Sequence, residues 1–154
     1  MLIEVKVRVA RVIDGKARWR TETYILDREF FSNAEYTVTE VLNAEQQQGL
    51  IEDFYILSLR QSAIKEIDEQ TIDNNRPSFI ATLIDIFLQD DGSEKKMKYK
   101  VLLWAENLTE ANHRANELSH QGYNMLIESI KQVDYEYLVG TSETNNTEEE
   151  AGDE

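Results

Sequence analysis

The sequence predicts an α+β fold in which two ββαβ repeats form an antiparallel-rich sheet with two helices packed on one face. Three observations support this prediction. A pattern of strand, turn, strand, helix and strand occurs twice, and the copies superpose at an offset of 77 residues. The opening segment alternates apolar and polar residues with the period of a half-buried strand. Each copy also has one segment with a single apolar stripe at helical spacing, which fits a helix covering one face of a sheet.

The repeat also predicts how the chain is divided. The core positions Ile3, Val5, Val7 and Val9 superpose on Ile80, Thr82, Ile84 and Ile86. We therefore expect a first repeat over residues 1–67, a connector over 68–78 that holds the single proline, a second repeat over 79–140, and a disordered acidic tail over 141–154.

The elements within each repeat follow from local signals. Strands are expected at residues 2–12, 17–27, 54–67, 79–88, 96–105 and 126–138. The first helix should begin near Asn33, because Ser32 followed by Glu35 is typical of a capping box, and Gly49 suits its end. Its inward stripe is Ala34, Val38, Val41 and Leu42. The second helix should begin at Thr109 and turn inward Ala111, Ala115 and Leu118.

The first hairpin turns at Asp14-Gly15, a dipeptide that favours tight turns between strands. A two-residue loop would place Glu22 opposite Val7 and mix charged with apolar side chains. A three-residue loop would place Thr23 there instead. We therefore expect a three-residue loop with a glycine-assisted bulge, because it keeps one apolar face intact.

The opening strand of the second repeat has apolar residues on both faces. Phe79, Leu83 and Phe87 lie on the face opposite the one that carries Ile80, Ile84 and Ile86. Two interpretations remain open. The strand is central and covered on both sides, or these three side chains contact a second copy of the chain or another protein.

Composition limits the class of partner. The chain has 154 residues, 30 acids, 16 bases and no cysteine, with a net charge of −14. The last 14 residues hold six acids and no base, so residues 1–140 keep 24 acids against 16 bases, a net charge of −8. General nucleic-acid binders carry clustered basic charge, so an anionic partner of this chain must meet a local basic patch. The absence of cysteine excludes disulfides, thiolate nucleophiles and zinc–thiolate sites.

No set of residues predicts catalysis, a cofactor or a metal. His113 and His120 lie seven residues apart on the second helix, whereas metal-binding pairs on a helix are three or four apart. The acids at Asp90, Asp91 and Glu94 lack the spacing of a calcium loop. No nucleophile elbow, phosphate loop or dinucleotide glycine pattern is present. We therefore expect a non-enzyme without cofactors.

The basic residues form the one constellation that predicts a binding site. The predicted register places them on the sheet surface away from the core: Lys6, Arg8, Arg18, Arg20, Lys95, Lys96, Lys98 and Lys100. Such a face could follow a phosphate backbone while Trp19, Tyr24 or Tyr99 stacks on bases. The alternative is that these charges are the ordinary solvent face of an antiparallel sheet.

The acidic tail bears on this hypothesis. An anionic tail beside a basic surface can occupy that surface until nucleic acid displaces it, or it can recruit partner proteins. Many single-strand-binding proteins of replication have tails of similar composition. The alternative is a solubilising tail that makes no contact.

The alternating opening strand and two further segments carry a family resemblance. YILDREFFSNAE, where a strand leads into a helix, and the exit strand FYILSLRQSAIKEI resemble an uncharacterised domain family of Bacteroidota and their phages and mobile elements. The resemblance covers roughly residues 1–138 and implies the duplicated α+β fold and a mobile-element context. The family has no established activity, so no catalytic residue carries over.

These observations predict an accessory protein that binds single-stranded nucleic acid through the basic face. The alternative is a protein–protein adaptor or assembly factor that docks through Phe79, Leu83 and Phe87. No run approaches the roughly 20 apolar residues of a membrane span, and no signal segment is evident. We therefore expect no membrane partner and a cytoplasmic location, in the host cytoplasm if the protein is phage-encoded.

Overall fold

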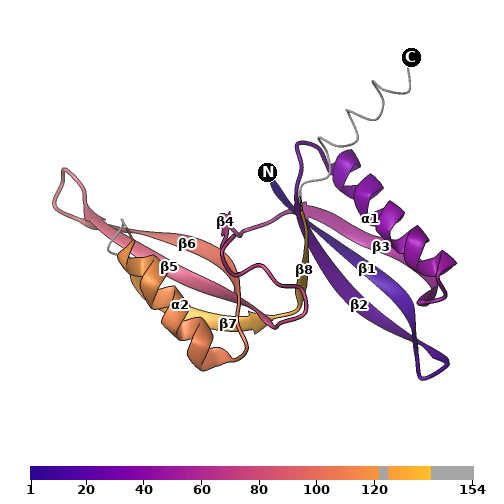
Figure 1. The fold of residues 1–154 in the computed structure, drawn as a ribbon. Coiled ribbons are helices and arrows are strands. Elements are labelled where there is room, and N and C mark those ends of the chain that lie inside the picture. Colours follow the sequence, from indigo (N-terminus) through magenta and orange to yellow (C-terminus); the bar gives the residue numbers. More distant parts are fainter. Residues whose placement is uncertain (122–124, 140–154) are drawn as a thin grey trace, which may run out of the picture. The chain divides into compact units, whose positions relative to one another are not determined.

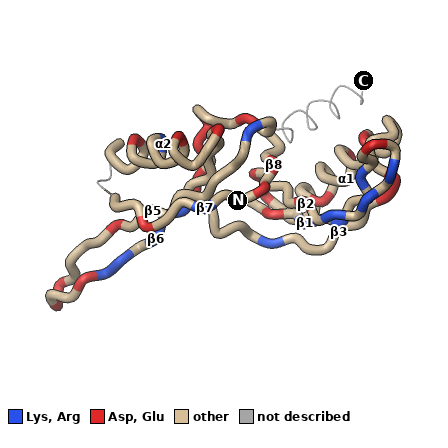
Figure 2. Tube along the Cα trace, turned by 90° about the horizontal axis from the view of Figure 1, so that it is seen from below, with Lys and Arg blue, Asp and Glu red and all other residues tan. Residues whose placement is uncertain are grey.

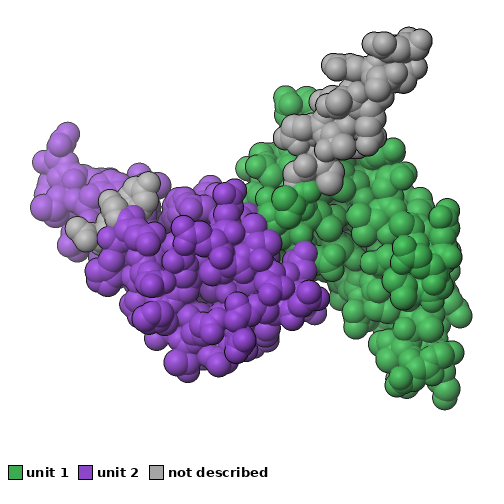
Figure 3. All heavy atoms as spheres, viewed as in Figure 1, with its two compact units in different colours: residues 1–62, 135–154 green, residues 63–134 purple. Residues whose placement is uncertain are grey.

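The computed structural model describes residues 1–121 and 125–139, which form two compact units. Unit 1 contains residues 1–62 and the segment that begins at Tyr135, and unit 2 contains residues 63–134 (Figure 3). The α+β class is confirmed. The described residues form two four-stranded sheets with one helix each, so the expectation of one sheet carrying both helices was wrong.

Unit 1 is a sheet with strand order β3-β1-β2-β8 and the helix α1 (Figure 1). Its elements are β1 (Leu2–Ile13), β2 (Lys16–Asp27), α1 (Phe31–Gln47), β3 (Ile51–Gln61) and β8 (Tyr135–Leu138). β1 pairs antiparallel with β2 and β3, and β8 adds parallel to β2. α1 packs on one face, and we name the other the helix-free face of unit 1.

The core of unit 1 follows the predicted alternation. The inward side chains of β1 are fully buried against α1 and comprise Ile3, Val5, Val7 and Val9. Those of α1 are Ala34, Thr37, Val38 and Leu42. α1 ends in a Schellman motif, in which Gly49 at φ +81° donates to Gln46 and Leu50 donates to Glu45. Its start differs from the prediction, because Phe30 is the N-cap and no side chain caps the helix.

The first hairpin has a two-residue loop, so the three-residue prediction was wrong. Ile13 pairs with Lys16, and Asp14 and Gly15 take φ values of +53° and +78°. Two central residues with positive φ match the twist of the strands they connect. Val7 therefore faces Glu22, the pairing that the prediction rejected.

Gly15→Ala should lower the free energy of unfolding of unit 1 by about 1 kcal/mol, because a side chain strains the left-handed backbone. A Cβ at this position meets no atom within 4 Å, so crowding adds nothing. Urea denaturation measures the loss. Gly15→Asn should cost less, since asparagine tolerates this conformation, and equal losses for both variants would contradict the turn geometry.

Unit 2 has the strand order β4-β6-β5-β7 and the helix α2 (Figure 1). Its elements are β4 (Glu66–Ile67), β5 (Ser78–Leu88), β6 (Glu94–Trp104), α2 (Leu108–His120) and β7 (Leu126–Val133). β5 pairs antiparallel with β6 and β7, and β4 adds parallel to β6. α2 is capped by Asn107, which accepts from the Glu110 N–H, in place of the predicted Thr109. The predicted inward residues Ala111 and Ala115 are buried.

The inward face of β5 is the reverse of the predicted one. Phe79 and Ala81 pack beneath α2, Leu83 on the same face is buried, and β5 is central between β6 and β7. Phe79 pairs with Leu103 as Ile3 pairs with Leu26. Leu103 of β6 therefore corresponds to Leu26 of β2 at an offset of 77 residues. Phe79 of β5 corresponds to Ile3 of β1 at an offset of only 76 residues. A shift of one residue moves every side chain of a strand to the other face.

Each predicted exit strand is split between the two sheets. β3 ends at Gln61, and the next strand of the chain, β4, belongs to unit 2. Likewise β7 ends at Val133, and β8 joins unit 1. The division therefore falls at 62/63 and 134/135, not at residues 67 and 79 as predicted. The predicted acidic tail lies outside the described residues.

Candidate nucleic-acid interface

Two aromatic side chains and an arginine meet on the helix-free face of unit 1. The rings of Trp19 on β2 and Tyr55 on β3 lie with centroids 5.9 Å apart at 52°. The Arg8 guanidinium lies 6.0 Å from the centroid of the Trp19 ring and donates to Thr21 Oγ1 at 3.3 Å. Trp19 and Tyr55 keep 47% and 53% of their surfaces exposed. We name Arg8, Trp19 and Tyr55 the aromatic platform.

The strand register explains why the platform forms. Arg8 pairs with Thr21 on β2 and with Tyr55 on β3, and Trp19 pairs with Ala10. Paired residues share a face, so all of these side chains lie opposite α1. Ala10 is small and buried, which leaves room for Trp19 and Tyr55 to meet diagonally across β1.

The helix-free face of unit 1 is basic near the platform. Lys6 lies between Thr23 and Ser58 on the neighbouring strands. Within the described part of the chain, neither Lys6 nor Arg8 forms an ion pair. Both cations are therefore available to an anion.

The strand register places three acids on this face, Glu4, Asp27 and Asp53, and Asp27 accepts from the N-terminal amine of Met1 at 2.8 Å. Glu4 is buried and accepts from the Arg60 guanidinium at 2.9 and 3.2 Å and from Ser62 Oγ at 2.6 Å. Its charge is thereby neutralised. Asp53 lies opposite Ala10 and accepts from the N–H of Phe54 at 2.8 Å.

Arg18 and Arg20 lie on the opposite face, so the predicted basic set is divided. The two-residue loop pairs Arg18 with Arg11 and Arg20 with Val9, on the side that α1 covers. Arg20 Nε donates to Glu22 at 2.6 Å. These two arginines therefore cannot join Lys6 and Arg8 in one contact surface.

An ion network beside α1 explains how a carboxylate is accommodated on the core side. Glu22 accepts from Arg11 at 2.7 and 2.9 Å, from Arg20, and from the Tyr24 hydroxyl at 3.1 Å. Arg11 also donates to Glu45 of α1 at 3.0 Å. Burial by itself raises the pKa of Glu22, but the hydrogen bonds from Arg11 and Arg20 outweigh it and lower the pKa below its usual value. The network is structural.

The other predicted stacking residues are not placed to stack. Tyr24 is buried in the core of unit 1. This burial raises the pKa of its hydroxyl, and the nearby Glu22 carboxylate raises it further. The Tyr99 hydroxyl donates to Glu66 of β4. Tyr55, which the sequence reasoning missed, takes their place. The signal was present in the alternation of β3, since Phe54 and Ile56 pack inward and Tyr55 between them must point outward.

Three of the four predicted lysines of unit 2 lie together. Lys96, Lys98 and Lys100 pair with Ile86, Ile84 and Thr82 on the face of β6 opposite α2, and we name them the lysine row. Figure 2 shows the lysines of β6 in blue. Lys98 contacts Glu128 at 3.2 Å. Lys95 pairs with Phe87 and points to the other face.

The predicted partner surface is mostly core. Phe79 and Leu83 are buried, so they cannot contact another protein, whereas Phe87 keeps 38% of its surface exposed. Large apolar side chains are also exposed near the end of the β5–β6 hairpin. They are Ile86, Phe87, Leu88 and Met97.

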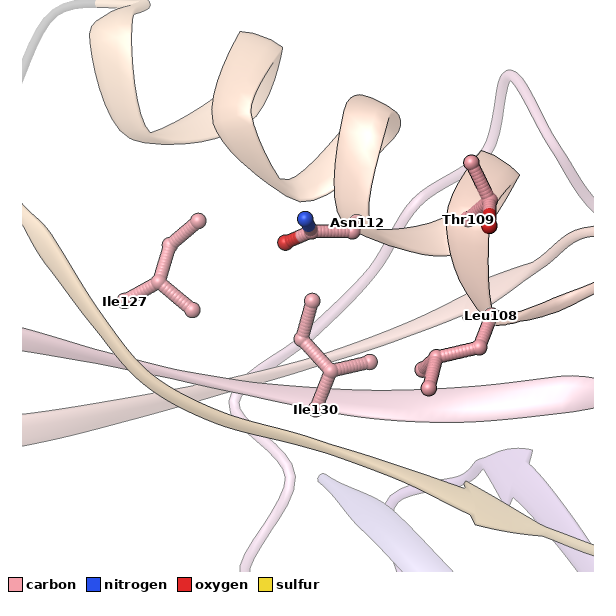
Figure 4. Close-up of a pocket in the computed structure, with 5 residues that line it drawn as sticks. All are labelled: Leu108, Thr109, Asn112, Ile127 and Ile130. Atoms are coloured by element: carbon pink, nitrogen blue, oxygen red, sulfur yellow. The ribbon is translucent and has the colours of Figure 1, made fainter.

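A hollow of about 390 Å³ lies between α2 and β7 (Figure 4). It is lined by Leu108, Thr109, Asn112, Ile127 and Ile130. Among the residues that the structure describes, none of the side chains that line the hollow is titratable.

Among the described residues, the remaining acids and histidines do not form a metal-binding cluster. Asp68 accepts from Arg114 of α2 at 2.8 and 2.9 Å, and Asp91 accepts from Ser93 within its turn. Across the residues that the structure describes, no group of three metal-ligating side chains is close enough to hold an ion. None of the described helices is long and apolar enough to cross a bilayer.

Comparisons with known proteins address the family. No curated protein and no solved structure matches the chain significantly. The family described as Domain of unknown function (DUF4494) matches residues 1–146, and the chain belongs to this family.

Proposed function

We propose that this protein is a non-enzymatic accessory protein that binds single-stranded nucleic acid on the helix-free face of unit 1. The observation that carries the proposal is the aromatic platform. Its two rings are half-exposed and adjoin an arginine that has no carboxylate partner among the described residues. Every base has a flat face, so such rings stack on single strands of any sequence.

Charge supports the same surface despite the acidity of the chain. Lys6 is the neighbour of Arg8 on the helix-free face of β1. The charge of Glu4, on the same face, is neutralised by Arg60. Lys6 and Arg8 therefore outnumber Asp53, the acid beside the platform, and the local charge favours an anion although the net charge of the chain is −14. The lysine row gives unit 2 a second cationic surface. Binding should weaken as salt rises, because each neutralised phosphate releases counterions.

Trp19→Ala and Tyr55→Ala should each weaken binding of poly-dT about 5- to 150-fold, since stacking on one base is worth about 1–3 kcal/mol. Fluorescence anisotropy of labelled poly-dT at low salt measures the affinity. In the native protein Trp19 emission should also be quenched on binding.

Tyr36→Ala is the matched control, because Tyr36 is an equally exposed aromatic on α1, away from the platform. It should leave the affinity unchanged. If poly-dT does not bind at low salt, even to a chain that ends at Gly140, the proposal is refuted.

A second candidate is a protein–protein adaptor, favoured by the exposed apolar end of the β5–β6 hairpin. Leu88→Asp changes its most exposed apolar residue. Sedimentation of the native chain and this variant distinguishes the candidates. A native dimer that the variant dissociates would favour the adaptor, whereas a monomer that binds poly-dT favours nucleic-acid binding.

The cellular setting belongs to the same proposal. We infer a cytoplasmic protein of a phage or mobile element of Bacteroidota. The support is the family resemblance of residues 1–138 together with the absence of cysteine. Neighbouring genes for replication would agree with nucleic-acid binding, whereas virion genes would favour the adaptor.

A further inference from the structure

We propose that the acidic tail, residues 141–154, docks on the helix-free face of unit 1 of its own chain and covers the aromatic platform. The competition with nucleic acid that follows rests on the proposed function, but the docking itself does not. Three features support the docking: the charge of the face, the position of the last described strand, and the length of the tail.

Charge complementarity favours docking on this face. Lys6 and Arg8 are unpaired among the described residues, and the buried Glu4 already holds Arg60. The tail has six acids and no base, and three of its acids are consecutive, at Glu148, Glu149 and Glu150. Opposite charges attract over about 10 Å at 0.1 M salt, so the cations beside the platform are a favourable position for these acids.

The chain leaves unit 1 from the edge of the same sheet. β8 pairs with β2 from Tyr135 opposite Thr23 to Leu138 opposite Leu26. Tyr135 shares the face of Thr23, and its hydroxyl lies 3.4 Å from Glu4 on the helix-free face. The last described strand therefore borders the helix-free face, and the tail must reach the platform from the end of that strand at Leu138.

The tail is long enough to reach the platform. Trp19 lies seven residues from Leu26 along β2, a distance of about 23 Å. Glu148 lies ten residues after Leu138, and a chain of that length spans up to about 33 Å. A tether of this length keeps the acids at a local concentration in the millimolar range, so weak contacts suffice for docking.

Iodide quenching of Trp19 tests the docking without nucleic acid. The chain has two tryptophans, and Trp104 is 1% exposed, so an ionic quencher reports on Trp19. Ending the chain at Gly140 should raise the quenching constant for iodide about twofold or more. Glu148→Gln, Glu149→Gln and Glu150→Gln together should have the same effect in a chain of native length.

A double variant that removes the two cations beside the platform identifies the docking surface. With Lys6→Gln and Arg8→Gln, removing the tail should no longer change the quenching. If the tail effect persists there but disappears when Lys96, Lys98 and Lys100 are changed to glutamine, the tail docks on the lysine row and the proposal is wrong. It is also wrong if tail removal has no effect, or if the effect grows with protein concentration, which would indicate docking between copies.

Poly-dT binding separates this inference from the proposed function. If both hold, the chain ending at Gly140 should bind poly-dT about 3- to 10-fold more tightly at low salt, with a smaller gain at high salt. Equal affinities with equal quenching would overturn the docking and leave nucleic-acid binding in place. A tail-dependent change in quenching without any poly-dT binding would overturn the proposed function and leave the docking in place.

Discussion

Phe79→Ala should lower the free energy of unfolding of unit 2 by about 3–5 kcal/mol, the usual cost of removing a buried phenylalanine. Phe79 packs with Leu103 and the alanines of α2 in a core of few side chains. Few neighbours can move to fill the space that the ring leaves. Urea denaturation followed by the fluorescence of Trp104 measures the loss, in a Trp19→Phe background that removes the signal of unit 1.

Phe87→Ala is the matched control, because the same residue type lies on the same strand and face but beyond the core. Phe87 is partly exposed, and its alanine variant should cost about 1 kcal/mol or less. Equal costs at the two positions would contradict the assigned faces of β5. If the native chain is a dimer that only Phe87→Ala dissociates, Phe87 belongs to a partner surface, as predicted.

The faces of β5 could not be read from the repeat, because both parities of this strand are apolar. The alignment at 77 superposed four aliphatic or threonine positions of each copy and was chemically plausible. Only the pairing separates the alternatives. A bulge falls between Lys6 and Val7 in unit 1 and between Thr82 and Leu83 in unit 2, and these positions correspond at an offset of 76. Strand register depends on such long-range contacts and is invisible to periodicity.

The exit strands were located in the sequence, but each was predicted as one continuous strand of a single sheet. The apolar pattern continues through the breaks near Ser62 and Asp134, so nothing local marks the change of sheet. Both short strands nevertheless have equivalent positions. Glu66 pairs with Val101 and Glu136 pairs with Tyr24, and Val101 and Tyr24 correspond at an offset of 77.

The candidate site was predicted in part. The sequence identified Lys6 and Arg8 because they alternate with core residues of the opening strand, and it named Trp19 as a stacking residue although the predicted loop placed Trp19 on the core side. The predicted three-residue loop placed Arg18 and Arg20 on the wrong face of the sheet. That loop was chosen on the assumption that no charged side chain faces the core. That assumption failed because Glu22 has charged partners on the same side, and Arg11 and Glu45 are far from it in sequence.

Glu22→Gln tests that explanation and should lower the free energy of unfolding of unit 1 by about 2–4 kcal/mol. The variant keeps the shape of the side chain but leaves Arg11 and Arg20 without the charge that they surround. Removing one partner of a fully buried pair costs about 3–5 kcal/mol. The expected loss is smaller here because Arg11 and Glu22 keep 19% and 15% of their side-chain surfaces exposed. Glu40→Gln, on the exposed face of α1, should change stability by less than about 0.5 kcal/mol.

The pH dependence separates loss of charge from loss of packing. The pKa of Glu22 is lower in the folded protein than in the unfolded chain, so its contribution is fully present above pH 4.5 and is lost as the pH falls through the folded value. The difference between native chain and Glu22→Gln should therefore be largest near neutral pH and shrink on acidification. A difference that stays constant down to pH 3 would show that the amide disturbs packing. A difference no larger than that of Glu40→Gln would show that water already solvates the network, and the two-residue loop would then have no electrostatic support from Glu22.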